Sequence, residues 1–176
     1  MIFVETALAG AFVVEPDIFT DHRGFLARTF CAKEFAAQGL ESGFVQSSLS
    51  FNRQKGTLRG MHFQKEPHAE DKLVRCEMGA IFDVIIDLRR QSPTFCRWFG
   101  IELNDSSRKA LYIPKGFAHG FITLTDNALV SYQMTQFYAP RSAAGVRYND
   151  PAFGIEWPLA PSTIVERDAN YEDFIL

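Results

Sequence analysis

The sequence predicts an all-β fold, and three observations support this class. Short runs of alternating polarity recur along the chain with the two-residue period of strands rather than the 3.6-residue period of helices. Aromatic residues make up 14% of the chain, including 17 phenylalanines, and aromatic side chains favour strands. Gly, Pro, Asn and Asp punctuate the runs, as at Lys55-Gly56 and Ser92-Pro93. Many evenly spaced strands are typical of a sandwich, jelly roll or barrel.

The expected elements cover nearly the whole chain. In the clearest strand, 80–88, one face is wholly apolar and consists of Phe82, Val84, Ile86 and Leu88. In chain order, the expected strands are 12–15, 44–51, 57–64, 72–77, 80–88, 97–103, 109–113, 119–124 and 129–138. Helices are expected only over 32–38 and in parts of the chain after 161. Because no low-complexity linker and no repeat divides the chain, we expect a single domain over residues 1–176.

Composition argues against several classes of protein. The formal net charge is −3 and the basic residues are scattered, so the basic patch of a nucleic-acid-binding protein is missing. No apolar run approaches 18 residues, so no membrane association is expected. No glycine-rich loop opens a long helix, which argues against a Rossmann or P-loop nucleotide fold. Cys31, Cys76 and Cys96 are odd in number and lack C-x-x-C spacing, which favours the reducing cytoplasm over a disulfide framework or a thiolate zinc site.

Four segments concentrate reactive side chains. Segment 58–64 contains Arg59 and His62, segment 72–76 contains Lys72, segment 114–120 contains His119, and segment 131–134 contains Tyr132. All four fall on expected strands or at strand ends. Because inward positions alternate along each strand of a small barrel, these side chains can converge on one pocket.

Together these segments resemble the dTDP-4-dehydrorhamnose 3,5-epimerase family of deoxysugar biosynthesis. Similar stretches occur in order along most of the chain, at 21–25, 82–84, 92–95, 138–140, 149–151 and 154–158. The resemblance implies a cupin-like jelly-roll barrel with a few short helices, a homodimer, and no metal or nicotinamide cofactor. It also implies an isomerase that inverts centres beside the C4 ketone of a sugar-nucleotide substrate, converting dTDP-4-dehydro-6-deoxy-D-glucose to dTDP-4-dehydro-L-rhamnose.

The resemblance also implies catalytic roles that suit the residue types. His62 matches the family's base, since imidazole accepts and returns protons near neutral pH. Asp168 matches the carboxylate that orients this histidine and stabilises its charged form. Tyr132 matches the acid that protonates the opposite face, with Tyr138 as the rival phenol. Lys72 supplies a compact charge that can donate a hydrogen bond to the enolate oxygen.

Further residues match positions around the substrate. Arg23 and Arg59 are candidate diphosphate clamps, because guanidinium offers paired donors to phosphate oxygens. The remaining substrate-binding candidates are Phe25, Arg28, Gln46, Ser48, His119 and Tyr138, with Asp83 as a support behind the catalytic histidine. Arg28 replaces a more usual Glu, and Gln46-Ser47-Ser48 replaces a more usual Gln-Asp-Asn. These departures lie near the nucleotide in the family, so the identity of the base stays open.

Alternatives to this function remain at the level of sequence. Pro114, Gly116 and His119 match the second motif of metal-binding cupins, but the first motif is incomplete because His62-Phe63-Gln64 lacks its second histidine. A metal-dependent cupin isomerase or dioxygenase is therefore disfavoured, and no metal site is expected. A mono-epimerase that inverts only C3 or only C5 of another nucleotide sugar shares the same catalytic residue types. A non-catalytic sugar-nucleotide-binding cupin is the third alternative, and the presence of the full catalytic set argues against it.

Overall fold

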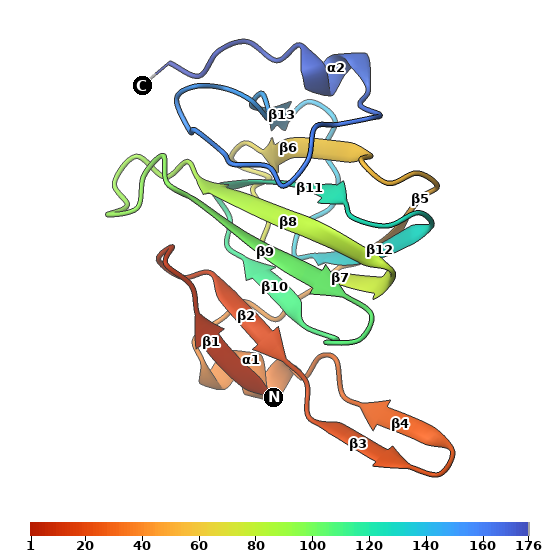
Figure 1. Ribbon diagram of the computed structural model, residues 1–176. Helices are drawn as coiled ribbons and strands as arrows, with labels where there is room; N and C mark the ends of the chain where they lie inside the picture. The colour runs from red at the N-terminus through yellow and green to blue at the C-terminus, as the bar shows by residue number, and fades with distance from the viewer. Residues whose placement is uncertain (176) are drawn as a thin grey trace.

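A computed structural model describes residues 1–175 and contains two large antiparallel sheets (Figure 1). The first sheet has, in spatial order, β1 (Ile2–Glu5), β2 (Phe12–Glu15), β10 (Ala110–Ile113), β7 (Lys72–Met78), β12 (Ala128–Met134) and β5 (Gln46–Asn52). The second sheet has β13 (Ala143–Gly145), β6 (Leu58–Gln64), β11 (Phe117–Thr123), β8 (Ala80–Asp87) and β9 (Trp98–Asn104). The predicted all-β fold class is confirmed.

A separate hairpin and two short helices complete the described chain. The hairpin consists of β3 (Ile18–Asp21) and β4 (Gly24–Ala27), and it projects away from both sheets (Figure 1). Helix α1 (Ala32–Ala37) and helix α2 (Glu166–Ala169) lie where the sequence predicts helix. Neither these helices nor any other within residues 1–175 is long and apolar enough to cross a membrane.

The strands differ from the sequence prediction in two respects. Strands β1, β3, β4 and β13 were not predicted, and β3 and β4 are almost entirely exposed, so they carry no one-sided apolar pattern to reveal them. The predicted strand 129–138 is too long, because β12 ends at Met134. Beyond it, the backbone N–H of Tyr138 donates to the side-chain oxygen of Gln46 at 2.6 Å instead of to a backbone carbonyl of the neighbouring strand β5.

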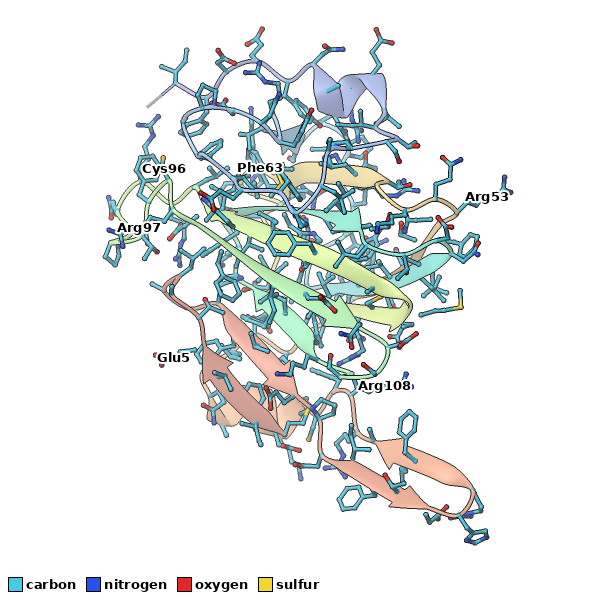
Figure 2. The ribbon with its side chains drawn as sticks, viewed as in Figure 1. Glu5, Arg53, Phe63, Cys96, Arg97 and Arg108 are labelled. Atoms are coloured by element: carbon cyan, nitrogen blue, oxygen red, sulfur yellow. The ribbon has the colours of Figure 1, made fainter. Side chains whose placement is uncertain are left out.

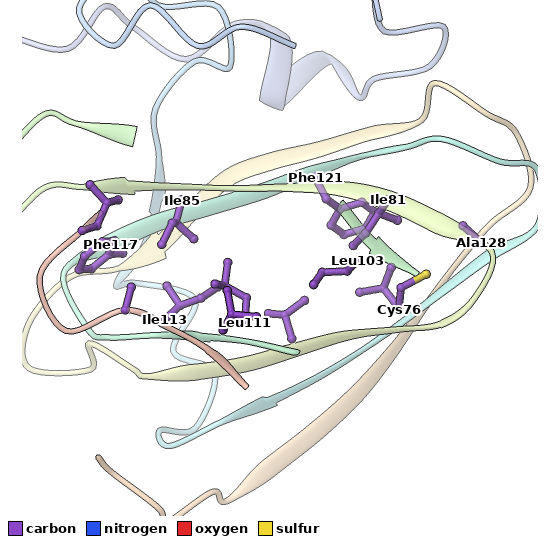
Figure 3. Packing of buried hydrophobic residues seen from close by; sticks show 14 residues of the cluster. Cys76, Ile81, Ile85, Leu103, Leu111, Ile113, Phe117, Phe121 and Ala128 are labelled. Carbon is purple, nitrogen blue, oxygen red and sulfur yellow. The ribbon is translucent and has the colours of Figure 1, made fainter. Parts of the chain in front are cut away.

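The main hydrophobic core lies between the two sheets (Figure 3). Ile81 and Ile85 enter it from β8, and Leu111 and Ile113 enter it from β10 on the opposite sheet. All four side chains are at most 1% exposed. Burying apolar surface from two sheets is what holds such a sandwich together, at roughly 25 cal/mol per Å² removed from water.

Strand β8 is buried on both faces. The wholly apolar face predicted from the sequence points away from the main core, where Val84 and Ile86 pack in a second cluster with Val146 and Phe153 from the C-terminal part of the chain. Trp157 packs against the same cluster. These contacts place the C-terminal part of the chain over the outer face of the second sheet. From there the chain continues towards β6.

Candidate active site

A cavity of about 930 Å³ lies between the two sheets. Strands β5, β7 and β12 form one wall, strands β6 and β11 form the other, and helix α2 with the residues before it closes one side. The candidates selected from the sequence that line this cavity are Gln46, Ser48, Arg59, His62, Lys72, His119, Tyr132, Tyr138 and Asp168. Residues spread over most of the chain therefore share one surface.

His62 on β6 contacts Asp168 on α2. His62 Nε2 lies 2.8 Å from Asp168 Oδ1, and the carboxylate side chain is only 2% exposed. An ionised carboxylate can only accept a hydrogen bond, so this contact places the proton of a neutral imidazole on Nε2. The lone pair then lies on Nδ1, which has no hydrogen-bond partner in residues 1–175 and is free to take a proton from a ligand.

The surroundings of Asp168 keep it ionised. Burial opposes the charged form, but hydrogen bonds outweigh it and hold the pKa of this carboxyl below its usual value. Apart from His62, the donors are the Gly60 backbone N–H, 3.2 Å from Oδ2, and Arg167 Nε, 3.1 Å from Oδ1. A permanent negative charge beside His62 stabilises the imidazolium that forms when the histidine accepts a proton.

A local irregularity of β6 brings two site residues to the same cavity. Arg59 and His62 are three positions apart, so a regular strand would point them to opposite faces. The β6–β11 register shifts between them, with His62 opposite His119 and Arg59 opposite Phe121. Gly60 lies inside this irregularity at φ +140°, and an added Cβ would approach the neighbouring strand's backbone to 2.5 Å, so only glycine fits.

Tyr132 and Lys72 lie on the opposite wall. In the register of β12 and β7, Met134 is opposite Lys72 and Tyr132 is opposite Val74. Lys72 and Tyr132 are therefore diagonal neighbours on one face of the first sheet. On the other side of Tyr132, strand β5 places Ser48 directly opposite it. The candidate acid and the candidate cation thus face the second sheet, which carries His62.

A second histidine–carboxylate pair lies beside the first. His119 Nε2 on β11 is 2.8 Å from Asp83 Oδ1 on β8, and His119 is directly opposite His62 in the β11–β6 register. Asp83 is fully buried and does not itself line the cavity. It therefore acts on the cavity only through His119, whose ring it orients.

Three of the substrate-binding candidates from the sequence lie outside the cavity in this chain. Arg23 and Phe25 belong to the β3–β4 hairpin, where Arg23 pairs with Asp21 and Arg108 lies 4.4 Å over the Phe25 ring. Figure 2 shows Arg108 at the end of the sheets that is nearest the hairpin. The hairpin itself projects away from both sheets. Arg28 pairs with Glu34 at 3.3 Å rather than with any residue of the cavity. A role for these residues in substrate binding remains a prediction.

Among the ionisable residues that line the cavity, sequence reasoning missed three, namely Glu70, Arg167 and Tyr171. Glu70 Oε1 lies 3.0 Å from Lys72 Nζ. Arg167 Nη2 lies 3.2 Å from His62 Nε2, and the Tyr171 ring meets the His62 ring edge to face at 6.4 Å. The adjacency of Arg167 to Asp168 and the alternation of Glu70 with Lys72 were the only signals available in the sequence.

The nitrogen and oxygen atoms around the cavity do not converge on a metal position. Within residues 1–175, no three His, Cys, Asp or Glu side chains are grouped so that they could hold a metal ion. The Nε2 atoms of His62 and His119 each face a carboxylate instead. The residues present therefore do not fit a cupin metal centre.

Known proteins resemble this chain over nearly its full length. The family model described as dTDP-4-dehydrorhamnose 3,5-epimerase matches residues 5–175. A dTDP-4-dehydrorhamnose 3,5-epimerase of Methanothermobacter thermautotrophicus is 43% identical over 173 residues, which cover 97% of this chain and 92% of that protein.

Solved structures agree with the family match. The crystal structure of dTDP-4-dehydrorhamnose 3,5-epimerase from Bacillus anthracis, with TDP and PPi bound, superposes with a TM-score of 0.95 at 38% identity and covers 98% of this chain and 99% of that chain. The dTDP-6-deoxy-D-glucose-3,5-epimerase from Legionella pneumophila, in complex with dTDP-4-keto-L-rhamnose, has a TM-score of 0.90 at 38% identity and covers 96% and 89%. The chain belongs to the dTDP-4-dehydrorhamnose 3,5-epimerase family.

Proposed function

We propose that this protein is a dTDP-4-dehydrorhamnose 3,5-epimerase, which inverts C3 and C5 of dTDP-4-dehydro-6-deoxy-D-glucose. One observation carries the proposal beyond family membership. A histidine backed by a buried carboxylate lies on one wall of the cavity, and a phenol and an ammonium lie on the wall opposite. Inversion at a carbon beside a ketone needs a base on one face, an acid on the other and a positive group at the oxygen.

The first step is proton abstraction by His62. Nδ1 takes the proton from the carbon next to the C4 ketone, and the electrons of the C–H bond form an enolate whose charge rests on the C4 oxygen. Asp168 offsets the charge of the imidazolium, so the proton transfer separates less charge than it would with histidine alone. Lys72 donates a hydrogen bond to the C4 oxygen and stabilises it as its charge increases.

The second step is delivery of a proton by Tyr132. The planar enolate lies between the sheets, so the Tyr132 hydroxyl protonates the face opposite His62 and inverts the centre. The phenolate regains a proton from solvent, and His62 releases its own to solvent. The same two groups serve C3 and C5 in turn, because both carbons flank C4. Tyr138 lines the cavity but is 64% exposed, which suits substrate binding better than acid catalysis.

The nucleotide occupies the part of the cavity around Arg59, Gln46 and Ser48. Arg59 Nε donates to Asn52 Oδ1 at 2.7 Å, which fixes the guanidinium and leaves its terminal nitrogens for phosphate oxygens. The Bacillus anthracis relative binds TDP, which supports a nucleotide as part of the ligand of this protein. His119, held by Asp83, adds a polar group beside the sugar.

We also propose that two copies of the chain form a homodimer. The β3–β4 hairpin exposes Phe19 and Leu26, which are 69% and 74% accessible. Exposed apolar side chains on a hairpin that packs on neither sheet favour contact with another chain, because that contact removes them from water. A partner's cavity would receive Arg23 and Phe25 and would explain why they are remote from the cavity of their own chain. Each chain acts as a single domain, and the three free cysteines suit the reducing cytoplasm.

Deuterium incorporation tests the reaction. Incubation of the purified protein with dTDP-4-dehydro-6-deoxy-D-glucose in deuterated water should place deuterium at C3 and C5 and yield the L-configured product. Deuterium at one carbon only would identify a mono-epimerase. Tight binding of the substrate with no exchange at either carbon would identify a binding protein and contradict the proposal.

A further inference from the structure

Glu70 is an acidic residue with a buried side chain that the proposed mechanism does not use. It lies just before β7, its side chain is 7% exposed, and it lines the cavity beside Lys72. Its Oε1 is 3.0 Å from the Lys72 ammonium, whose side chain is 12% exposed. A carboxylate is rarely buried unless it is paired, because removing its charge from water is costly.

Lys72 is the only partner of Glu70 within residues 1–175. The second oxygen of Glu70, Oε2, is buried and accepts no hydrogen bond there. The neighbouring Asp71 differs, since its oxygens accept from the hydroxyls of Tyr112 and Thr135 at 2.9 and 3.3 Å. Asp71 therefore links the segment before β7 to β10 and to the end of β12, whereas the ion pair of Glu70 within residues 1–175 is with Lys72. Moving the ammonium away would leave a buried charge unpaired, so Glu70 keeps Lys72 in place.

The pair changes how Lys72 acts on a ligand. The ammonium has three donors and lies 3.0 Å from Glu70 Oε1, so at least two donors remain for the cavity. As a neutral pair, Glu70 and Lys72 attract an anionic diphosphate weakly from a distance. A directional hydrogen bond to the C4 oxygen is different, because it strengthens as negative charge develops on that oxygen.

We propose that Glu70 is a positioning residue for the epimerase reaction. Glu70 holds the Lys72 ammonium where it can donate a hydrogen bond to the enolate oxygen, and its negative charge weakens the attraction between Lys72 and the diphosphate of the nucleotide. The proposal rests on the proposed function, since it assigns Lys72 to the enolate. Because of Glu70, Lys72 stabilises the transition state, while it contributes little to the affinity for the diphosphate. Catalysis and nucleotide affinity should consequently respond in opposite directions when the carboxylate is neutralised.

Two variants separate the charge of Glu70 from its position. Glu70→Gln keeps a carbonyl acceptor for Lys72 but removes the negative charge, so kcat should fall about 10- to 100-fold and the Kd for dTDP should decrease about threefold. Glu70→Asp keeps the charge but withdraws it by one methylene, so kcat should fall while the Kd for dTDP stays within about twofold of wild type. Calorimetry measures dTDP binding without turnover, and NMR measures kcat. Glu66 is an exposed residue of the same segment, so the control variant Glu66→Gln should change neither kcat nor the Kd for dTDP.

The outcomes distinguish this proposal from the proposed function. If wild-type protein turns over and Glu70→Gln keeps full kcat, or binds dTDP more weakly, Glu70 does not position Lys72. If either variant unfolds, the other still tests the proposal, because each alone predicts a loss of kcat with a defined change in Kd. A wild-type protein that binds dTDP but exchanges no substrate proton would overturn the proposed function itself.

Discussion

His62 Nε2 and Asp168 Oδ1 lie 2.8 Å apart although the two residues are 106 positions apart in the sequence. The contact exists because the chain after β13 packs over the outer face of β8 and then turns back towards β6. Thr163 bridges to Thr57 at the start of this return, and α2 follows three residues later. The reactivity of His62 consequently depends on a segment that belongs to neither sheet.

Replacing His62 with Asn should abolish both epimerisation and solvent exchange. The change removes the proton acceptor but leaves Arg59 and the rest of the nucleotide site in place, so the Kd for dTDP should stay within about threefold of wild type. NMR of the substrate in deuterated water and calorimetry with dTDP measure the two effects. Turnover close to wild type would remove His62 from its role as base.

Tyr132→Phe should uncouple exchange from inversion. The variant loses one oxygen and keeps the ring, so His62 can still abstract a proton and return a deuteron to the same face. Inverted product should fall by about 10²- to 10⁴-fold, as is typical when a general acid is lost, while exchange persists. Both can be followed by NMR at C3 and C5.

Two tyrosines serve as controls for that experiment. Tyr148 lies outside the cavity, so Tyr148→Phe should leave turnover unchanged. Tyr138→Phe tests the rival acid and should affect substrate binding more than inversion. Loss of exchange together with inversion in Tyr132→Phe would mean that the phenol is needed for abstraction as well, and loss of neither would transfer the acid role to Tyr138 or a water molecule.

Asp168→Asn should change the acid dependence of stability. The pKa of Asp168 is lower in the folded protein than its usual value, so the carboxylate stabilises the fold above the unfolded-state pKa and loses this effect as pH falls through the folded-state pKa. Wild type should exceed the variant by about 2 kcal/mol at pH 7, the range for a hydrogen bond to a charged group. The gap should shrink below about pH 4.

Urea unfolding between pH 3 and pH 7 measures this difference. The m-value of the two proteins should agree, because the same surface becomes exposed when each unfolds. A difference between wild type and Asp168→Asn that stayed constant over the whole range would contradict an ionised Asp168 as its source.

Exhaustive chelation should leave the activity of the purified protein unchanged. The imidazole nitrogens of His62 and His119 that face Asp168 and Asp83 are already engaged, and proton transfer beside a ketone needs only an acid, a base and a fixed cation. Initial rates before and after dialysis against EDTA provide the measurement. Loss of activity that a divalent metal restores would contradict this mechanism.

The protein should sediment as a dimer at micromolar concentration, with about twice the 19.9 kDa mass of one chain. Replacing Leu26 with Asp should weaken the dimer, because a charged side chain then takes the place of an exposed apolar side chain of the hairpin. Arg23→Ala should raise KM more than it lowers kcat. A monomer with full activity would exclude a site shared between two chains.

The residue pattern was sufficient for the class of fold, and it suggested one pocket shared by Arg59, His62, Lys72, His119 and Tyr132. Alternating polarity in 72–77 and 80–88 is a local property of neighbouring residues, and it correctly predicted strands β7 and β8. Both strands of the hairpin were missed because their two faces are equally exposed, so no pattern distinguishes them. The resemblance to a family supplied Asp168, whose acidic side chain carries no local signal of its own.

Tertiary structure decided the contacts within the site. The sequence shows a lysine at position 72, but its ion pair with the buried side chain of Glu70 follows from how the segment before β7 folds against the cavity. Likewise, Arg59 and His62 are on one strand in the sequence, and only the register shift against β11 turns both to the same cavity. Local alternation is set by neighbouring residues, whereas these contacts depend on strand register and on the path of the C-terminal segment, which the burial of apolar surface across the whole molecule determines.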